Sequence, residues 1–375
     1  PDCRRSSPVT WISSTMHFRY RRHLGWLLLI IVLLVVIRLL LPYGVRHYLN
    51  NRMQRMGDYH GQIADIDLHL WRGAYSIDGL QIVKVSGKVP VPLLDAPRTD
   101  IRLSWRALTR GLLRGKVAFS RPVLNFVDGN GKDDTQNGKG VDWRSKLKLL
   151  VPMRLDELSV TNGTITFHNF VSSPRVDLKM TDVNGTASNL TNVERQGGSR
   201  VANMHATAKI LGEAPLETHA QFDPLKDHGD FKIDLRVSHV DLTKANQLAR
   251  AYTGLDLASG EGDFTMQLEA SHGELTGYAK PLFQHLQIFS WKQDVEQDHK
   301  NPFQLAWEAT AQVVTSIFKN HSKDQFATRI PISGRIDNKQ LGTFEAIVNI
   351  LRNAFVQAYT PQLEHLQPAS NANKH

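Results

Sequence analysis

The first pattern along the chain is an unbroken apolar run near its start. Residues 24–41 read LGWLLLIIVLLVVIRLLL. A helix of this length rises about 27 Å at ~1.5 Å per residue, which is close to the roughly 30 Å hydrocarbon core of a bilayer. Arg38 lies within one turn of the end of the run, where its side chain can reach the membrane interface. We therefore predict a transmembrane helix over residues 24–42.

Two alternatives concern the first residues. A cleavable signal peptide would need small residues at the cleavage spacing, and 41–46 (LPYGVR) hold no such pair, which favours an uncleaved anchor. Arginines flank both ends of the run almost equally, but long domains translocate largely regardless of charge. We expect residues 1–23 to be a cytoplasmic tail. If translation starts instead at Met16, residues 1–15 are not native.

From residue 61 onward, apolar and polar residues alternate with a period of two. Such alternation is typical of strands with one apolar and one polar face. It predicts a mainly β domain over 61–366, built as an elongated, curled sheet of antiparallel type, with a frayed tail over 367–375. Asn-Gly pairs at Asn162 and Asn184 match glycosylation sequons but are read more simply as tight turns. The alternating segments are 63–70, 77–85, 101–105, 117–119, 123–127, 158–160, 165–167, 176–180, 231–237, 264–268 and 275–277.

Helical periodicity is confined to a few segments. Residues 43–60 predict a helix that continues out of the membrane, either lying near the bilayer surface or forming a solvated stalk. Short helices are predicted over 104–113 and 242–252. Two late amphipathic helices are predicted over 302–319 and 343–365, each with an apolar stripe at helical spacing.

The composition fits a folded protein. Of 375 residues, 41% are hydrophobic and 22% charged, which is enough for a sizeable core. The only cysteine is Cys3, so the β domain has no disulfide and no cysteine-based zinc site or nucleophile. A net charge of +9 would suit a nucleic-acid partner, but the chain has no recognition motif for one, and we expect none.

No motif supports catalysis. Ser316 and Lys319 match the serine–lysine spacing of penicillin-recognising enzymes, but the companion motifs are missing, and Ile317 and Phe318 suit an ordinary buried helix. The chain also lacks a glycine–serine nucleophile elbow and a phosphate-binding glycine loop. We therefore expect a protein that is not an enzyme and uses no cofactor.

Residue spacing does not indicate a metal site either. None of the sixteen histidines forms the helical pair with a glutamate that zinc hydrolases use. Residues 128–140 resemble a calcium loop only superficially, because Lys132 and Lys139 stand at ligand positions, so we predict a solvated loop. Histidines near expected strand ends or turns are read as surface groups: His168, His219, His228, His239 and His272.

One charge pattern has a functional alternative. Five arginines recur every four residues: Arg98, Arg102, Arg106, Arg110 and Arg114. On the predicted 104–113 helix, Arg106 and Arg110 would lie together and could bind phosphate headgroups near the membrane. The alternative is a solvated polar face on a basic protein.

Four segments carry a resemblance to a known family. They are 63–126, which begins IADIDLHLWRGAYSIDGLQIVKV and ends RPVLNF, then LDELSVTNGTITFHN at 155–169, VSHVDLTKANQLARAYTGLDLASGEGDFTMQLEASHGELTGYAK at 237–280, and DQFATRIPISGRIDNKQLGTFEAIVNILRNAFVQAY at 324–359. Their order resembles the AsmA-like superfamily of Gram-negative envelope proteins, specifically its domain-of-unknown-function (DUF) 748 branch. The resemblance implies a periplasmic domain tethered to the inner membrane, with strands curled into a taco-like groove lined by apolar side chains.

Larger members of that superfamily are regarded as bridge-like phospholipid carriers, so the resemblance implies a lipid-related role. This chain is shorter: some 20 strands at about 4.8 Å each would reach only ~100 Å. We expect a protein that binds or guides phospholipid acyl chains in the groove and supports outer-membrane lipid homeostasis, with the membrane and larger envelope transport proteins as partners. The periodicity alone leaves open a sealed core instead of a groove. The groove candidates are Val117, Phe119, Ile165, Phe167, Phe231, Ile233, Phe264 and Met266.

The alternative function is structural or regulatory. Exposed strand edges can bind a partner by adding a strand, and such a protein would assist the assembly of outer-membrane proteins. The sequence favours neither the lipid class nor the direction of transfer.

Overall fold

The computed structural model describes most of the chain from Met16 to Ser290 and short segments beyond it. The described residues are 16–54, 56–69, 73–110, 114–129, 131, 133–136, 154–190, 202–223, 230–253, 255–290, 325–327, 329–336, 350 and 353–354. The late helices predicted over 302–319 and 343–365 lie outside these residues, apart from helical positions 350, 353 and 354. The tails over 1–15 and 367–375 also lie outside them.

The chain begins with one long helix, α1 (Met16–Met53), which passes through Pro42 without a break. Its segment Gly25–Met53 is long and apolar enough to cross a membrane, and its most apolar part is not buried by the rest of the protein. Large apolar side chains from Trp26 to Leu41 are exposed. Because water solvates such a surface poorly, the first half of α1 is a candidate membrane span.

The second half of α1 packs against the sheet. Leu49 and Met53 are buried, and Val45 packs beside them. The Asn50 amide accepts a hydrogen bond from the backbone N–H of Ile63 at 2.8 Å and donates to the Ile63 carbonyl at 3.1 Å. The predicted 43–60 helix therefore ends earlier, at Met53. Its apolar side contacts the protein's own core. This segment therefore neither lies along the bilayer surface nor forms a solvated stalk.

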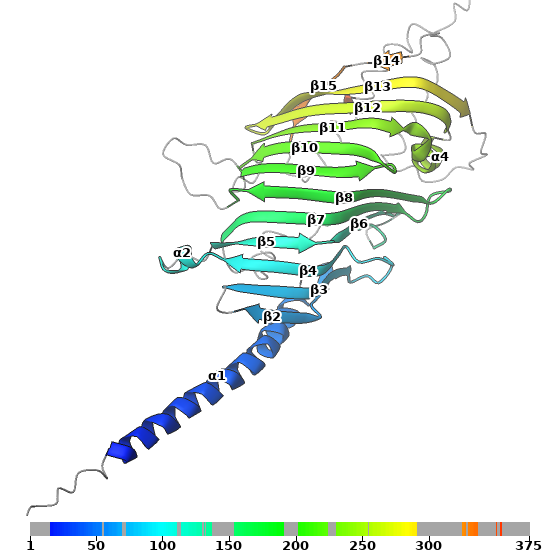
Figure 1. Ribbon diagram of the computed structural model, residues 1–375. Helices are drawn as coiled ribbons and strands as arrows, with labels where there is room; N and C mark the ends of the chain where they lie inside the picture. The colour runs from blue at the N-terminus through cyan, green and yellow to red at the C-terminus, as the bar shows by residue number, and fades with distance from the viewer. Residues whose placement is uncertain are drawn as a thin grey trace, which may run out of the picture.

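Among the described residues, fifteen strands form one sheet, and Figure 1 shows how they are arranged. They are β1 (Tyr59–Gln62), β2 (Asp65–His69), β3 (Ala74–Lys84), β4 (Leu94–Leu103), β5 (Arg114–Ser120), β6 (Val123–Asp128), β7 (Arg154–Asn169), β8 (Val176–Ser188), β9 (Ala202–Ile210), β10 (Ala214–Phe222), β11 (Phe231–Asp241), β12 (Leu255–Ser271), β13 (Glu274–Ser290), β14 (Gln325–Ala327) and β15 (Ile330–Arg335).

The strands stack almost in chain order, starting beside α1 and moving away from it (Figure 1). β1 and β2 pair with the two halves of β3, and β14 and β15 with the two halves of β13. The predicted mainly β architecture is confirmed. Its antiparallel character has one exception, because β7 runs parallel to both β5 and β6. The main path holds 12 strands, or about 58 Å at ~4.8 Å per strand, which is less than the reach expected from some 20 strands.

The register aligns apolar residues on one side of the sheet across twelve strands. We call this side the apolar face. One unbroken row of register partners is Leu68, Tyr75, Ile101, Val117, Leu158, Ala187, Met204, Ala220, Ile233, Leu268, Gly277 and Ile332. The next row on the same face runs from Ile66 through Phe119, Val160 and Leu235 to Ile330.

The other side, the polar face, is equally continuous. Its matching row is Asp67, Ser76, Asp100, Ala118, Ser159, Thr186, His205, His219, Asp234, Gln267, Tyr278 and Pro331. Because successive side chains of a strand point to opposite faces, the period of two in the sequence becomes a sheet with one apolar side and one polar side.

Several of the long strands change phase once along their length. In β7 the apolar positions are Leu158 and Val160 first, and Ile165 and Phe167 afterwards, so their parity changes. A bulge between these pairs, at residues 161–162, keeps both on the same face. The tight turns predicted at Asn162 and at Asn184 were therefore wrong, because β7 and β8 continue through these Asn-Gly pairs.

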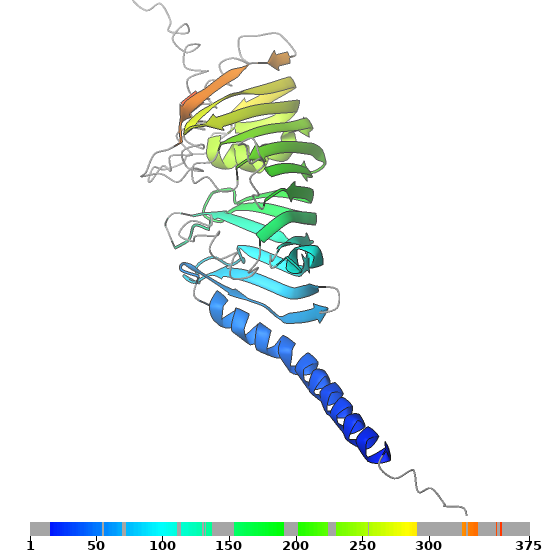
Figure 2. The same ribbon diagram turned by 90° about the vertical axis from the view of Figure 1, so that its left-hand side faces the viewer.

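Residues with positive φ mark similar irregularities in neighbouring strands. Asn162 donates its backbone N–H to the Asn184 side chain at 3.0 Å, and His239 donates to the Asp263 carboxylate at 2.9 Å. Bulges bend strands, so a line of them curves the sheet, as Figure 2 shows. The positive-φ residues at these points are Gly79, Arg121, Asn162, Asp182, His239, Gly260 and His285.

The short helices fall close to their predicted places. α2 spans Trp105–Leu108, so its described part is shorter than the predicted 104–113 helix. The predicted 242–252 helix is a 3-10 turn, η2 (Leu242–Ala245), followed by α4 (Asn246–Thr253). Asp241 caps η2 by accepting from the backbone N–H of Thr243, as its side-chain chemistry predicts.

Three buried clusters lie along the sheet. The α1-end core joins Leu49 and Met53 of α1 to β1–β5, including Ile77 and Ile101. The middle cluster lies on β9, β10 and β11, and includes Leu216 and Val237. The far-end core is built on β12, β13 and β15: Leu268, Ala270, Leu275, Ala279, Ile330, Ile332, Ile336 and Ala354.

Candidate functional site

The apolar face carries all eight groove candidates. Val117, Phe119, Ile233 and Met266 belong to the two rows described above, and Ile165, Phe167, Phe231 and Phe264 are placed on the same face by their register partners. Val117 is only 4% exposed, and the other seven side chains are half-buried. Their common face was expected, whereas contact with lipid remains a prediction.

The candidates differ in what covers them. Val117 belongs to the α1-end core and Phe119 packs against it. Phe231, Phe264 and Met266 pack against the far-end core. These five residues therefore adjoin the packed ends of the sheet, where Val117 is buried and the other four keep some accessible surface.

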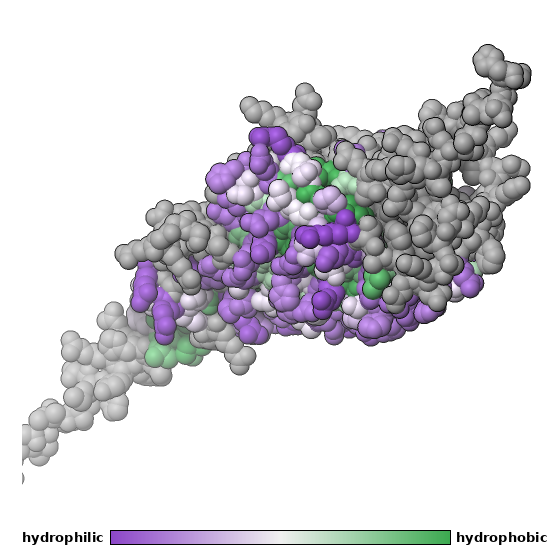
Figure 3. All heavy atoms as spheres, turned by 90° about the horizontal axis from the view of Figure 1, so that it is seen from above, coloured by the Kyte–Doolittle hydropathy of each residue, from purple (hydrophilic) through white to green (hydrophobic). Residues whose placement is uncertain are grey.

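The middle strands are covered less completely. In β7, Leu158, Val160, Ile165 and Phe167 are all half-buried, although each belongs to the apolar face. Figure 3 looks along the stack of strands from its far end, and its coloured residues are mostly hydrophilic, with hydrophobic residues gathered in patches. On β7, each of these four apolar-face residues keeps accessible surface, whereas Ile101 of β4 and Val117 of β5 are buried.

η2 and α4 cover one part of this face. Leu242 of η2 packs with the middle cluster, and a Cβ at Gly260 or Gly262 would lie 3.1 Å from its side chain. These glycines therefore let η2 approach the sheet closely. The Asn246 side chain accepts from the Leu257 N–H at 2.7 Å and donates to its carbonyl at 2.9 Å, which fixes α4 to β12.

The two arginines proposed to bind headgroups do not share one helix in the described residues. Arg106 is exposed on α2, and Arg110 is exposed in the turn that follows. The same series ends at Arg114, which forms a two-pronged ion pair with Asp156 of β7, with its shortest bond at 2.7 Å. Of the five arginines, Arg102, Arg106 and Arg110 are exposed, whereas Arg98 and Arg114 form ion pairs with Asp100 and Asp156.

A polar pocket of about 430 Å³ lies at β2–β4. Ser76 donates to the Asp100 carboxylate at 2.7 Å, and Arg98 donates to the same carboxylate at 3.1 Å and to the Ser76 hydroxyl at 3.2 Å. Since these donors and acceptors satisfy one another, Ser76 is not arranged as a nucleophile beside a base. We read this group as structural.

The calcium-like segment also makes structural contacts. Asp133 pairs with Lys88 at 3.3 Å, and Gln136 is fully buried, donating to the carbonyls of Asn125 and Val91. The described part of the 128–140 segment therefore folds back on β6, where a solvated loop was expected.

Sequence comparison gives no family assignment. Neither a scan against models of known protein families nor a search of curated proteins found a match. The fold and the apolar face therefore define the class: a chain with one candidate membrane span followed by a single curved β-sheet with one apolar side.

Sequence reasoning missed several members of this face. Leu158, Val160, Met204 and Leu235 occupy the same rows as the candidates but were not singled out. The alternation of apolar and polar residues could have identified them, if it had been followed through each bulge. The positions of the bulges, however, are known only from the strand pairing.

Proposed function

We propose that this protein is anchored in the inner membrane of a Gram-negative bacterium and holds its β domain in the periplasm. There it binds or guides phospholipid acyl chains along the apolar face and supports outer-membrane lipid homeostasis. Resemblance to the AsmA-like superfamily motivates the compartment and the role. The alternative, a factor that assists outer-membrane protein assembly through its strand edges, is an outcome of the test below.

One observation carries the proposal: the apolar rows continue from β2, beside α1, to β15 at the far end. A globular core needs no such length. A path for acyl chains does, because a chain moving along it must stay on apolar surface at every step, at roughly 0.8 kcal/mol per methylene. The half-buried side chains of β7 supply that surface in the middle of the path.

The placement of α1 supports a path that has one end at the membrane. Its exposed apolar half precedes β1, and its second half is packed into the α1-end core. Arg38 reaches the carbonyl of Leu68 on β2 at 3.4 Å, so the sheet begins close to the end of the apolar run. Acyl chains leaving a bilayer around α1 would meet β2 and β3 first.

The test uses photo-crosslinking in the full-length protein in membranes. A benzophenone amino acid replaces Phe119, Phe231 or, as the polar-face control, Lys232. We expect lipid adducts at Phe119 and Phe231 and none at Lys232, which neighbours Phe231 in β11 but is exposed on the opposite face. Mass spectrometry of the adduct identifies the lipid class.

A charge placed between the two probes separates transport from local binding. The substitution is Phe167→Asp, because Phe167 lies on β7, between β5 and β11 in the strand order. We expect it to lower crosslinking at Phe231 and leave Phe119 unchanged, since a carboxylate on the path is costly to desolvate. Lys179→Asp, on the polar face of β8, is the matched control and should change neither.

Circular dichroism confirms that each variant is folded. The proposal is overturned if the apolar-face probes capture no lipid, and adducts of these probes with another envelope protein would then favour the assembly role. Equal adducts at Phe231 with and without Phe167→Asp would keep lipid binding but exclude passage along β7.

A further inference from the structure

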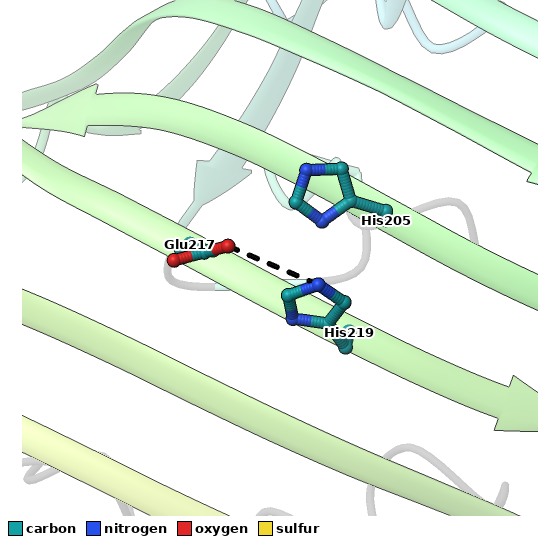
Figure 4. A group of neighbouring side chains, drawn as sticks. All are labelled: His205, Glu217 and His219. Atoms are coloured by element: carbon teal, nitrogen blue, oxygen red, sulfur yellow. Dashed lines mark ion pairs between the residues drawn. The ribbon is translucent and has the colours of Figure 1, made fainter.

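A compact group of metal-ligating side chains lies on the polar face, away from the surface used in the proposed function. His205 of β9 and His219 of β10 are register partners, and Glu217 lies two residues before His219 on the same face, as Figure 4 shows. The two imidazole rings are 4.4 Å apart between centroids. The Glu217 carboxylate is 3.8 Å from Nε2 of His219.

The three side chains offer one ligand atom each within 4.8 Å of one another, and all three residues are exposed. Tetrahedral Zn²⁺ with ligands at about 2.0–2.1 Å requires ligand atoms roughly 3.4 Å apart. Small side-chain rotations would close the difference, and exposed side chains can make them. Two imidazoles and one carboxylate are a ligand set that zinc sites use, with a fourth position left for water or another group.

The backbone fixes this arrangement. β9 and β10 form a hairpin through Leu211 and Gly212, both with positive φ, and the pairing from Ile210 to Ala202 keeps an unbroken register. His205 therefore faces His219 through the strand pairing itself, so the two rings need no loop to hold them together.

A second observation lies one strand further on. Asp234 of β11 is the register partner of His219, and its Oδ1 is buried without a hydrogen-bond partner among the described residues. A buried carboxylate oxygen without a donor is unfavourable. Histidine ligands commonly donate their second ring N–H to a carboxylate, which orients the ring and raises its basicity.

The geometry points to a divalent transition-metal site, with Zn²⁺ as its reference ion, formed by His205, His219 and Glu217 and supported by Asp234. The ion joins β9 to β10 on the polar face and keeps at least one coordination position open. It stands outside the path for acyl chains, so it is independent of the proposed lipid function.

The test measures Zn²⁺ binding to the full-length protein in detergent, purified without a histidine tag and stripped of metal. Competition with a chromophoric chelator gives the affinity. We expect a single Zn²⁺ in this site, at least about 10-fold weaker binding for His205→Ala and for His219→Ala, and a smaller loss for Glu217→Gln. X-ray absorption should show two imidazole ligands on the bound zinc.

Two variants serve as controls. His285→Asn removes another exposed histidine at a positive-φ position, where asparagine is tolerated, and should leave binding unchanged. Arg236→Gln removes the positive charge that opposes Glu217 in register and should leave the affinity unchanged or raise it. The site is overturned if the wild-type protein binds no Zn²⁺, if both histidine variants bind as tightly as wild type, or if His285→Asn causes the same loss.

Discussion

Two neighbouring regions of the apolar face, β4–β5 and β7, have the same hydrophobic pattern but differ in how deeply their side chains are buried. On β4 and β5, next to α1, Ile101 is 1% exposed and Val117 is 4% exposed. On β7, the next strand of the same face, Leu158, Val160 and Ile165 are half-buried. The register carries both regions on one continuous apolar face. The difference arises because Ile101 and Val117 belong to the buried cluster that starts at the end of α1, so the same side of the sheet is a sealed core there and a candidate binding surface further on.

The largest expected effect is on stability, and it compares the same change, isoleucine to alanine, in the two regions. Ile101→Ala should cost about 2–5 kcal/mol of unfolding free energy, because it leaves a cavity in the α1-end core. Ile165→Ala removes the same atoms from a half-buried position and should cost clearly less, about 1–2 kcal/mol. Denaturant unfolding of the full-length protein in mild detergent gives both values.

The comparison of Ile101 with Ile165 has a simple contrary result. Equal losses at the two positions would mean that β7 is packed as tightly as β4. The middle of the apolar face would then be a core rather than a binding surface, and the proposed lipid path would lose its central segment.

The next largest effect is a dependence on alkaline pH. Tyr75 packs against the α1-end core, and its burial raises the pKa of the phenol to about 12. Below about pH 10 the phenol is neutral in both the folded and unfolded chains. Above that pH the unfolded chain loses the proton first, so stability should fall as the pH rises towards 12, by about 2 kcal/mol in all.

Tyr75→Phe isolates this contribution from other groups that titrate at high pH. The difference in unfolding free energy between wild type and Tyr75→Phe should be constant up to about pH 10 and should then move against wild type. A difference that stays constant up to pH 12 would show that the α1 end admits water around this ring, contrary to its description as a sealed core.

The sequence predicted the architecture well because alternation is a local signal. A period of two over short segments identifies strands, and the apolar run before them identifies α1. The cover over each strand was not predictable, since Ile101 and Ile165 have the same local pattern. What separates them is that Ile101 belongs to the buried cluster that includes Leu49 and Met53 of α1, which come from a distant part of the chain.

Two further misses share one physical cause. The Asn162–Gly163 pair was read as a turn, but it is a bulge inside β7, because Asn184 on the neighbouring strand accepts its backbone N–H. His219 is exposed, as predicted for a surface histidine, but its position beside His205 was not predicted, because strand pairing brings the two together. In both cases the deciding partner lies on another strand, so the register had to be known first.

The smallest expected effect compares two asparagines, one in each region, that tie a strand backbone in place. Asn50→Ala removes the two half-buried hydrogen bonds to Ile63 beside the α1-end core and should cost about 1–2 kcal/mol, after the better helix propensity of alanine is allowed for. Asn184→Ala removes the exposed acceptor of Asn162 and should cost about 1 kcal/mol or less, because water can replace it. The free energy of unfolding of each variant measures the two costs. A larger loss at Asn184 than at Asn50 would mean that the strand bulges contribute more than the packing of α1 to the stability of the curved sheet.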